Sequence, residues 1–160
     1  MPLAAIALGS NLGDRDAHLA WAVERLAEHL TDLRLSSILE TEPVDVPEPQ
    51  PPYLNAVAVG KTDLSAEALM RTLLDLERER GRTRLSARAP RTLDLDLILY
   101  DDLILNTDAL TVPHPRFRER RFVLAPLADL APNWKDPVTG KSVATLLAEL
   151  GPWAIGHGPK

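Results

Sequence analysis

The stretch PRTLDLDLILYDD, residues 90–102, carries an apolar run that is interrupted only by Asp94 and Asp96. Its alternation of leucine with aspartate is typical of a β-strand, which we predict over Leu93–Leu99. Residues two apart in a strand point to the same face and lie roughly 6.6 Å apart along it. The two carboxylates are therefore within reach of one magnesium ion or a close pair of ions. The alternative is the solvent-facing edge of an ordinary amphipathic strand.

Arginines crowd the segment before this strand, which contains no acidic residue. Five of them fall between the preceding helix and the strand: Arg80, Arg82, Arg84, Arg88 and Arg91. Fixed cations beside a metal site are typical of polyphosphate chemistry. Arg82 and Arg84 follow the end of the helix and Arg91 precedes the strand, so we expect these three to point into a site. Arg78 and Arg80 are expected to be solvated.

The composition of the 160-residue chain is that of a globular protein, with 45% hydrophobic and 26% charged residues. We expect a single domain over residues 1–160. The net charge of −5 argues against a nucleic-acid-binding surface. Only four of the 18 basic residues are lysines, and clustered arginines suit a compact anion.

The chain has no cysteine, which excludes disulfides and thiolate sites. Its apolar runs are too short for a membrane span, and the N-terminal run has no basic leader. We therefore expect a cytoplasmic protein that does not bind membranes.

Hydrophobic periodicity predicts the order strand, helix, strand, strand, helix, strand. The predicted elements are Leu3–Gly9, a helix through Leu19–Leu30, Leu33–Glu40, Leu54–Val59, a helix from Ser65 to Gly81, and Leu93–Leu99. This order predicts an α+β, ferredoxin-like βαββαβ core, an antiparallel sheet with both helices on one face. Residues 101–160 contain short helical candidates at Phe122–Leu130 and Ser142–Leu150. We expect them to form a C-terminal extension of the same domain without a clear second core.

Two further residues are candidates for the site. His114 lies between Pro113 and Pro115, whose rings restrict it to an extended segment. It is either structural or a neutral or charged hydrogen-bond donor to an anion, and the arginines that follow it favour the second interpretation. Glu77, on the last turn of the second helix, is either part of the site or an ordinary surface carboxylate.

Aromatic residues are scarce, and two of them lie beside polar or basic groups. Tyr53 and Asn55 stand where a proline-rich loop enters the third strand, and Phe122 follows the second arginine cluster. An aromatic ring there can stack on a planar heterocycle while Asn55 binds its edge by paired hydrogen bonds. The alternative is a core aromatic and a turn asparagine.

Several separated segments together resemble the 6-hydroxymethyl-7,8-dihydropterin pyrophosphokinase family. They are ALGSNLGD at 7–14, YLN at 53–55, Arg82-x-Arg84, PRTLDLDLILYDD at 90–102, VPHPR at 112–116, and Arg120-x-Phe122. They occur in the family's order between about Leu3 and Pro132. The resemblance implies transfer of the terminal diphosphate of ATP to the pterin hydroxymethyl group, which gives AMP and the pterin diphosphate for folate biosynthesis.

The resemblance also implies roles for individual residues. Asp94 and Asp96 would bind two Mg²⁺ ions, and Arg82 and Arg91 would stabilise charge on the transferred group. ATP would be contacted by Glu77, Arg84, Arg88, His114 and Arg120. The pterin would be held by Tyr53 and Asn55, with Phe122 stacked on its ring. ATP and 6-hydroxymethyl-7,8-dihydropterin are the expected partners of a monomer.

One segment departs from the family's pattern. Many members carry Arg-Trp-Gly-Pro-Arg before the acidic pair, whereas residues 88–91 are Arg-Ala-Pro-Arg, one residue shorter and without the tryptophan. Because that tryptophan helps a loop to close over the substrates, we predict weaker or differently timed closure here.

Three other functions are compatible with parts of the pattern. A non-catalytic ferredoxin-like module that senses a nucleotide would not need paired acids beside arginines. A nucleotidyltransferase of palm-like fold also uses an aspartate pair, but it releases diphosphate and not AMP. A module that binds single-stranded RNA would need exposed aromatics on its central strands, and the predicted strands at Leu3–Gly9 and Leu54–Val59 have none.

Overall fold

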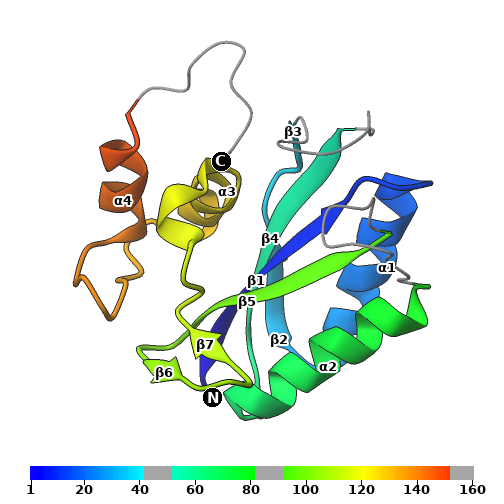
Figure 1. Cartoon of the computed structure of the whole chain (residues 1–160), viewed down its shortest axis with the longest axis horizontal. Helices are drawn as coiled ribbons and strands as arrows, with labels where there is room; N and C mark the ends of the chain where they lie inside the picture. The colour runs from blue at the N-terminus through cyan, green and yellow to red at the C-terminus, as the bar shows by residue number, and fades with distance from the viewer. Residues whose placement is uncertain (42–51, 82–91, 152–160) are drawn as a thin grey trace.

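An antiparallel sheet runs through the middle of the computed structural model, which describes residues 1–41, 52–81 and 92–151 (Figure 1). Its strand order is β2-β4-β1-β5, and a short strand β3 also pairs with β4. The strands are β1 (Leu3–Ser10), β2 (Thr31–Leu35), β3 (Leu39–Thr41), β4 (Tyr53–Lys61) and β5 (Asp94–Tyr100). The two inner strands, β1 and β4, are almost wholly buried. This order confirms the predicted ferredoxin-like arrangement.

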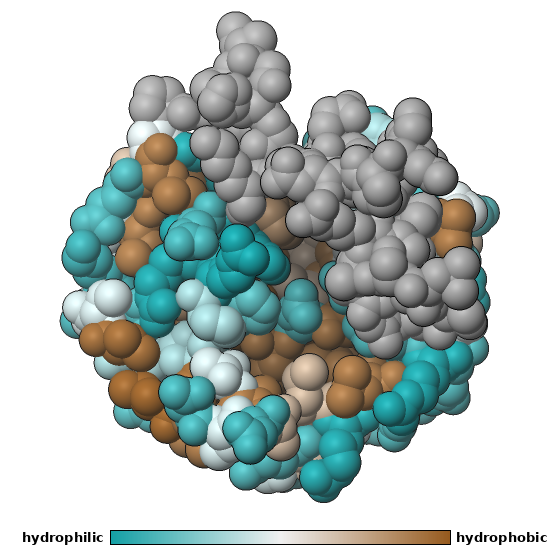
Figure 2. All heavy atoms as spheres, viewed as in Figure 1, coloured by the Kyte–Doolittle hydropathy of each residue, from teal (hydrophilic) through white to brown (hydrophobic). Residues whose placement is uncertain are grey.

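Two helices cover one face of the sheet, as predicted (Figure 1). They are α1 (Arg15–Leu26) and α2 (Ala66–Glu79). The predicted cap of α2 is confirmed, because the Ser65 side chain accepts a hydrogen bond from the Ala68 amide. Gly81 ends the helix with a φ of +88°, which glycine adopts without strain. Hydrophilic residues line the rim where α2 runs in Figure 2, so the helix buries one face and exposes the other.

The opposite face of the sheet carries a second hydrophobic core, and the expectation of an extension without such a core was wrong. Beyond a small hairpin, this C-terminal part consists of a 3₁₀ turn η1 (Phe117–Glu119), α3 (Arg121–Leu130) and α4 (Val143–Glu149). The hairpin strands are β6 (Leu105–Asn106) and β7 (Thr111–Val112). The sheet half of this core comes from inner-strand residues such as Ala5, Val57 and Val59. Strands buried on both faces read as continuous apolar runs, and the lack of alternation in Leu3–Gly9 and Leu54–Val59 is the sequence signal of this second core.

The strand predicted over Leu33–Glu40 is divided in two at Ser36. The Ser36 amide donates to the Val57 carbonyl at 2.9 Å, and its Oγ accepts from the Val57 amide at 2.9 Å. The hydroxyl thus accepts the hydrogen bond that a backbone carbonyl of a neighbouring strand would otherwise accept. Serine side chains can compete in this way with the backbone hydrogen bonds of a sheet. The alternation of apolar and polar residues in the sequence does not predict that a serine side chain replaces a backbone group here.

A β-bulge lies within β5. The pairing with β1 steps from Leu97 opposite Ile6 to Leu99 opposite Ala5, so Ile98 is the extra residue. Both Ile98 and Leu99 consequently belong to the second core. The Ile98 carbonyl accepts a hydrogen bond from the His114 amide at 2.9 Å, which ties the His114 segment to β5.

Ser10, the last residue of β1, is fully buried, and among the described residues its Oγ has no hydrogen-bond partner. An unsatisfied buried hydroxyl costs free energy, so Ser10→Ala is expected to raise the free energy of unfolding by about 1 kcal/mol. Urea denaturation would measure the change. Ser36→Ala is the matched control, since that serine is also buried but its hydroxyl is bonded, and it should lower stability by about 1 kcal/mol. A loss of stability in Ser10→Ala would contradict the prediction.

No helix among the residues that the structure describes is long and apolar enough to cross a membrane.

Candidate active site

A row of three residues crosses the sheet at one end and forms the base of the candidate site. Gly9 of β1 lies opposite Asn55 of β4 on one side and opposite Asp94 of β5 on the other. In the next row Ala7 lies between Val57 and Asp96. Adjacent strands are roughly 4.8 Å apart, so Asn55 and Asp94 are about 10 Å from one another across a residue without a side chain.

The acidic pair lies as the alternation predicts. Asp94 and Asp96 are half-buried. Leu95 and Leu97 belong to the hydrophobic core between the sheet and the helices α1 and α2. The carboxylates therefore share the opposite face, which is the face of the second core. Each has interactions with other groups of the protein.

Glu77 supports this part of β5 from the helix side. It is only 3% exposed, and its Oε2 accepts a hydrogen bond from the Leu95 amide at 2.7 Å. Leu95 is the residue between the two aspartates, and β5 is the edge strand of the sheet. Glu77 thus satisfies an amide of this edge strand and holds the segment that carries the aspartates. Its interpretation as an ordinary surface carboxylate was wrong.

His114 stands beside the acidic pair as a neutral hydrogen-bond donor. Burial, helped by the charges of Arg120 and Arg116 and opposed by Asp94, lowers the pKa of His114 to about 4. Its Nδ1 accepts from the Arg116 amide at 3.2 Å, which leaves the proton on Nε2. Of the forms that the sequence left open, the neutral one is therefore present at pH 7. The structure places His114 close enough to Arg120 and Asp94 for both charges to shift its pKa.

This lowered pKa predicts how stability changes with pH in the absence of nucleotide. The unfolded chain takes up a proton on His114 near pH 6.5 and the folded protein only near pH 4. Between these values the unfolded state binds more protons, so stability should fall as the pH decreases from 6.5 to 4 and change no further on this account below 4. His114→Gln should flatten the dependence of the urea midpoint on pH in this window.

The matched control for this measurement is His29→Gln, which changes a histidine just beyond α1 and should retain the slope. His18 also has a lowered pKa, because of burial and the charge of Arg80, so some slope should remain in His114→Gln. A slope unchanged by His114→Gln would contradict the assignment of His114.

Two of the three side chains predicted to hold a heterocycle, Asn55 and Tyr53, lie at the other end of the row. Asn55 is buried, and its Nδ2 donates to Thr41 Oγ1 at 2.6 Å. A Cβ placed on Gly9 would lie 3.4 Å from Asn55 Oδ1 and 3.8 Å from Tyr53 Cδ1, so both side chains border the glycine. Phe122, in the first turn of α3, packs against the second core, and its ring lies under the guanidinium of Arg120, 5.7 Å from ring centroid to Cζ.

Sequence reasoning missed two residues of this arrangement. Gly9 was interpreted only as the end of a strand, although a glycine in an otherwise apolar strand signals a close approach. Thr41 has no signal of its own, because its position depends on the pairing of β3 with β4, where it lies opposite Tyr53.

Four of the predicted arginines lie outside the described residues: Arg82, Arg84, Arg88 and Arg91. The shortened Arg-Ala-Pro-Arg segment lies there too. Arg80, the last arginine before them, was expected to be solvated, and this was wrong. Its Nε donates to His18 Nδ1 at 2.9 Å, and its guanidinium lies over the Trp21 ring at 5.2 Å. Arg78 is exposed, as expected.

The acidic pair fits magnesium better than a metal held by the protein alone. No group of three or more histidine or carboxylate side chains among the described residues could hold a metal ion. Mg²⁺ is commonly bound by one or two carboxylates, with phosphate oxygens and water as its other ligands. Asp94 and Asp96 supply oxygen donors of that kind on one face.

Comparison with known proteins finds sequence similarity over most of the chain. The family model described as 7,8-dihydro-6-hydroxymethylpterin-pyrophosphokinase (HPPK) matches residues 5–132. The chain is 40% identical over 154 residues to a 2-amino-4-hydroxy-6-hydroxymethyldihydropteridine pyrophosphokinase of Synechocystis sp., which covers 95% of this chain and 78% of the relative. A protein of the same name from Bacillus subtilis is 46% identical over 130 residues, or 80% of this chain and 77% of the relative.

Some relatives are much longer. The chain is 38% identical to the folic acid synthesis protein fol1 of Pneumocystis carinii but spans only 20% of its length. Among solved structures, an HPPK-DHPS of Plasmodium falciparum superposes with a TM-score of 0.72 at 13% identity, covering 92% of this chain and 45% of that one. At such low identity the likeness concerns the fold alone, which is that of the HPPK part of these proteins.

Proposed function

The chain belongs to the 7,8-dihydro-6-hydroxymethylpterin-pyrophosphokinase family, and we propose that it transfers the diphosphate of ATP to the hydroxymethyl group of 6-hydroxymethyl-7,8-dihydropterin. The products are AMP and the pterin diphosphate, and the reaction is a step of folate biosynthesis. The observation that carries the proposal is the row Asn55–Gly9–Asp94, in which an amide side chain suited to a planar acceptor and one aspartate of the acidic pair lie on either side of a residue without a side chain.

Tyr53, Asn55 and Phe122 would hold the pterin. Asn55 is pinned by Thr41 through one amide hydrogen, which leaves its Oδ1 and its second amide hydrogen for the edge of the heterocycle. Phe122 presents an aromatic face for stacking. A pterin placed there has the open backbone of Gly9 between its ring and the acidic pair, and its hydroxymethyl group can extend toward Asp94.

The phosphates of ATP would lie over β5. The Nε2 proton of neutral His114 and the guanidinium of Arg120 are donors for phosphate oxygens. Glu77 would lie near the nucleotide, where it holds the Leu95 amide of β5. Arg84 and Arg88 would add phosphate contacts. Arg82 and Arg91 would stabilise the charge of the transferred group. Asp94 and Asp96 would hold two Mg²⁺ ions, which when bound neutralise phosphate charge and polarise the phosphoryl oxygens.

The reaction then needs positioning more than covalent chemistry. A bond forms between the hydroxymethyl oxygen and the β-phosphorus of ATP, the bond from that phosphorus to the α-phosphate oxygen breaks, and the hydroxyl proton is released. Rigid strands hold the acceptor and the acidic pair at fixed separation, which reduces the entropic cost of bringing the two substrates together. We propose that one copy of the chain suffices, because every assigned side chain comes from it. The cytoplasmic location stays a prediction.

The test is AMP formation from ATP and Mg²⁺ with and without 6-hydroxymethyl-7,8-dihydropterin. We expect AMP to appear only when the pterin is present, with one pterin diphosphate formed for each AMP. ATP binding without AMP would indicate the nucleotide-sensing module instead. Release of diphosphate with a nucleotide attached to the acceptor would indicate a nucleotidyltransferase.

A further inference from the structure

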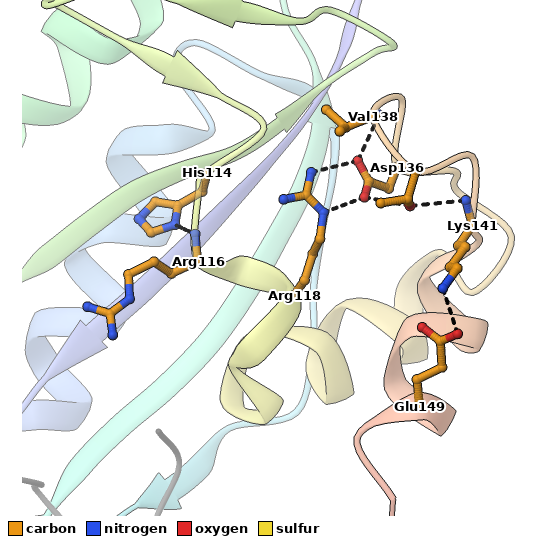
Figure 3. A network of polar contacts seen from close by, with 8 residues as sticks. His114, Arg116, Arg118, Asp136, Val138, Lys141 and Glu149 are labelled. Atoms are coloured by element: carbon orange, nitrogen blue, oxygen red, sulfur yellow. Dashed lines mark hydrogen bonds and ion pairs between the residues drawn. The ribbon is translucent and has the colours of Figure 1, made fainter.

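A buried ion pair lies behind the nucleotide side of the site, in a part of the chain that no role above uses. The Asp136 side chain is fully buried, and the Arg118 side chain is 26% exposed. Arg118 Nε donates to Asp136 Oδ2 at 2.5 Å and Nη2 donates to Oδ1 at 2.9 Å (Figure 3). This two-point geometry fixes direction as well as distance, which a single contact between charges does not do.

Asp136 is held from its own side as well. Its Oδ1 accepts from the Val138 amide at 3.0 Å and its Oδ2 from Thr139 Oγ1 at 2.8 Å. The backbone closes around it, since the Asp136 amide donates to the Lys141 carbonyl and its own carbonyl accepts from the Gly140 amide. Burial would raise the pKa of Asp136, but the ion pair with Arg118 and these hydrogen bonds outweigh it, so the pKa is lowered and the group is ionised. The carboxylate is thus a fixed anchor to which Arg118 must conform.

Arg118 occupies the middle of η1, a single turn that joins the two proposed phosphate-binding groups. The Phe117 amide donates to the His114 carbonyl, and the Arg120 amide donates to the Phe117 carbonyl. Phe117 is buried in the second core, so it limits how far the turn can shift. In Figure 3 the side chain of Arg118 extends to Asp136 while that of Arg116 points away from it. Phe117 and Arg118 together therefore set the rotation of the turn.

We propose that Asp136 is a positioning residue for nucleotide binding, which acts by holding Arg118 so that His114 and Arg120 keep the orientation that the ATP phosphates require. This inference rests on the proposed function. It assigns to the C-terminal extension a part in the reaction beyond covering the sheet. Of the residues proposed to hold the pterin, Tyr53 and Asn55 lie on β4, away from this support, whereas Phe122 lies in the first turn of α3 beside Arg120. The effect should therefore be larger for the nucleotide than for the pterin.

The experiment compares binding of two ligands to purified variants. The probes are α,β-methylene-ATP with Mg²⁺, which cannot transfer its diphosphate, and 6-hydroxymethyl-7,8-dihydropterin, each titrated by calorimetry. Asp136→Asn and Arg118→Met should each weaken nucleotide binding about tenfold and leave pterin binding within about twofold. Because the two residues act as a unit, the double variant should bind the nucleotide no worse than either single variant. Arg118→Lys, which retains the charge but not the two-point contact, should fall between.

Lys141→Met is the matched control. It removes an exposed ion pair, Lys141 Nζ to Glu149 Oε2 at 2.8 Å, from the same loop, and it should leave both affinities unchanged. If Asp136→Asn does not fold, Arg118→Met and Arg118→Lys still decide the question, because Arg118 is partly exposed. Equal weakening of both ligands, or a lower melting temperature with unchanged affinities, would overturn the proposal. A natural chain that binds the nucleotide analogue but forms no AMP would count against the proposed function, and the affinities would still test Asp136.

Discussion

Replacing Asp94 or Asp96 by asparagine is expected to lower the rate of pterin-dependent AMP formation by about 10³-fold, with the fold retained. Asparagine has the same shape as aspartate but no charge, so it removes the anionic oxygen ligands and leaves the packing unchanged. Both residues lie on one face of β5, whose edge is held by Glu77 through the Leu95 amide, and neither substitution removes that bond. The measurement is the initial rate of AMP release at saturating Mg²⁺, with melting temperature as a check on folding.

The aspartates are expected to act as one unit. The double variant should therefore be little worse than either single variant, as is found for residues that share one task. Asp102→Asn is the matched control, because Asp102 is an exposed acid just beyond the same strand and should leave the rate unchanged. A fall of less than about tenfold in both single variants would remove the acidic pair from the reaction.

Gly9→Val is expected to weaken pterin binding by about 10- to 100-fold while the nucleotide analogue binds normally. A branched side chain on Gly9 would fill the space between Asn55 and Asp94, and its Cβ would already lie 3.4 Å from Asn55 Oδ1. The strand should tolerate it, since valine favours extended backbone. Calorimetric titration with the dihydropterin and with α,β-methylene-ATP measures the two affinities separately.

Gly9→Ala is the graded control for this prediction. A Cβ alone makes ordinary van der Waals contacts at this position, none nearer than 3.4 Å, so the effect on pterin binding should be no more than a few-fold. Equal losses of both ligands in Gly9→Val would mean that the sheet had shifted as a whole. Full pterin affinity in that variant would place the heterocycle elsewhere.

Local chemistry made parts of the fold predictable. The second helix has a serine cap, leucines at helical spacing and a glycine stop, and α2 begins and ends where these signals stand. The third and fourth predicted strands, Leu54–Val59 and Leu93–Leu99, lie within a residue or two of β4 and β5. These signals act over a few residues, so no distant contact is needed to interpret them.

Contacts between residues far apart in the chain explain the predictions that were wrong. The predicted Leu33–Glu40 strand divides because the Ser36 hydroxyl bonds to Val57, 21 residues away. Arg80 was expected to be solvated, but His18 and Trp21, from a different helix, provide its surroundings. In each case a polar side chain interacts with a residue far from it in the sequence, which the pattern of the adjacent residues cannot predict.

By itself the sequence determined which chemistry is available: alternation put Asp94 and Asp96 on one face, and the element order specified the antiparallel core. Only the tertiary structure decided what those groups face. Strand pairing set Gly9 between Asn55 and Asp94, helix packing brought the buried Glu77 to the Leu95 amide, and the fold of the C-terminal extension paired Arg118 with Asp136. The physical reason is that periodicity encodes the direction of a side chain from its own backbone, whereas its partners depend on strand register and packing between residues far apart in the chain.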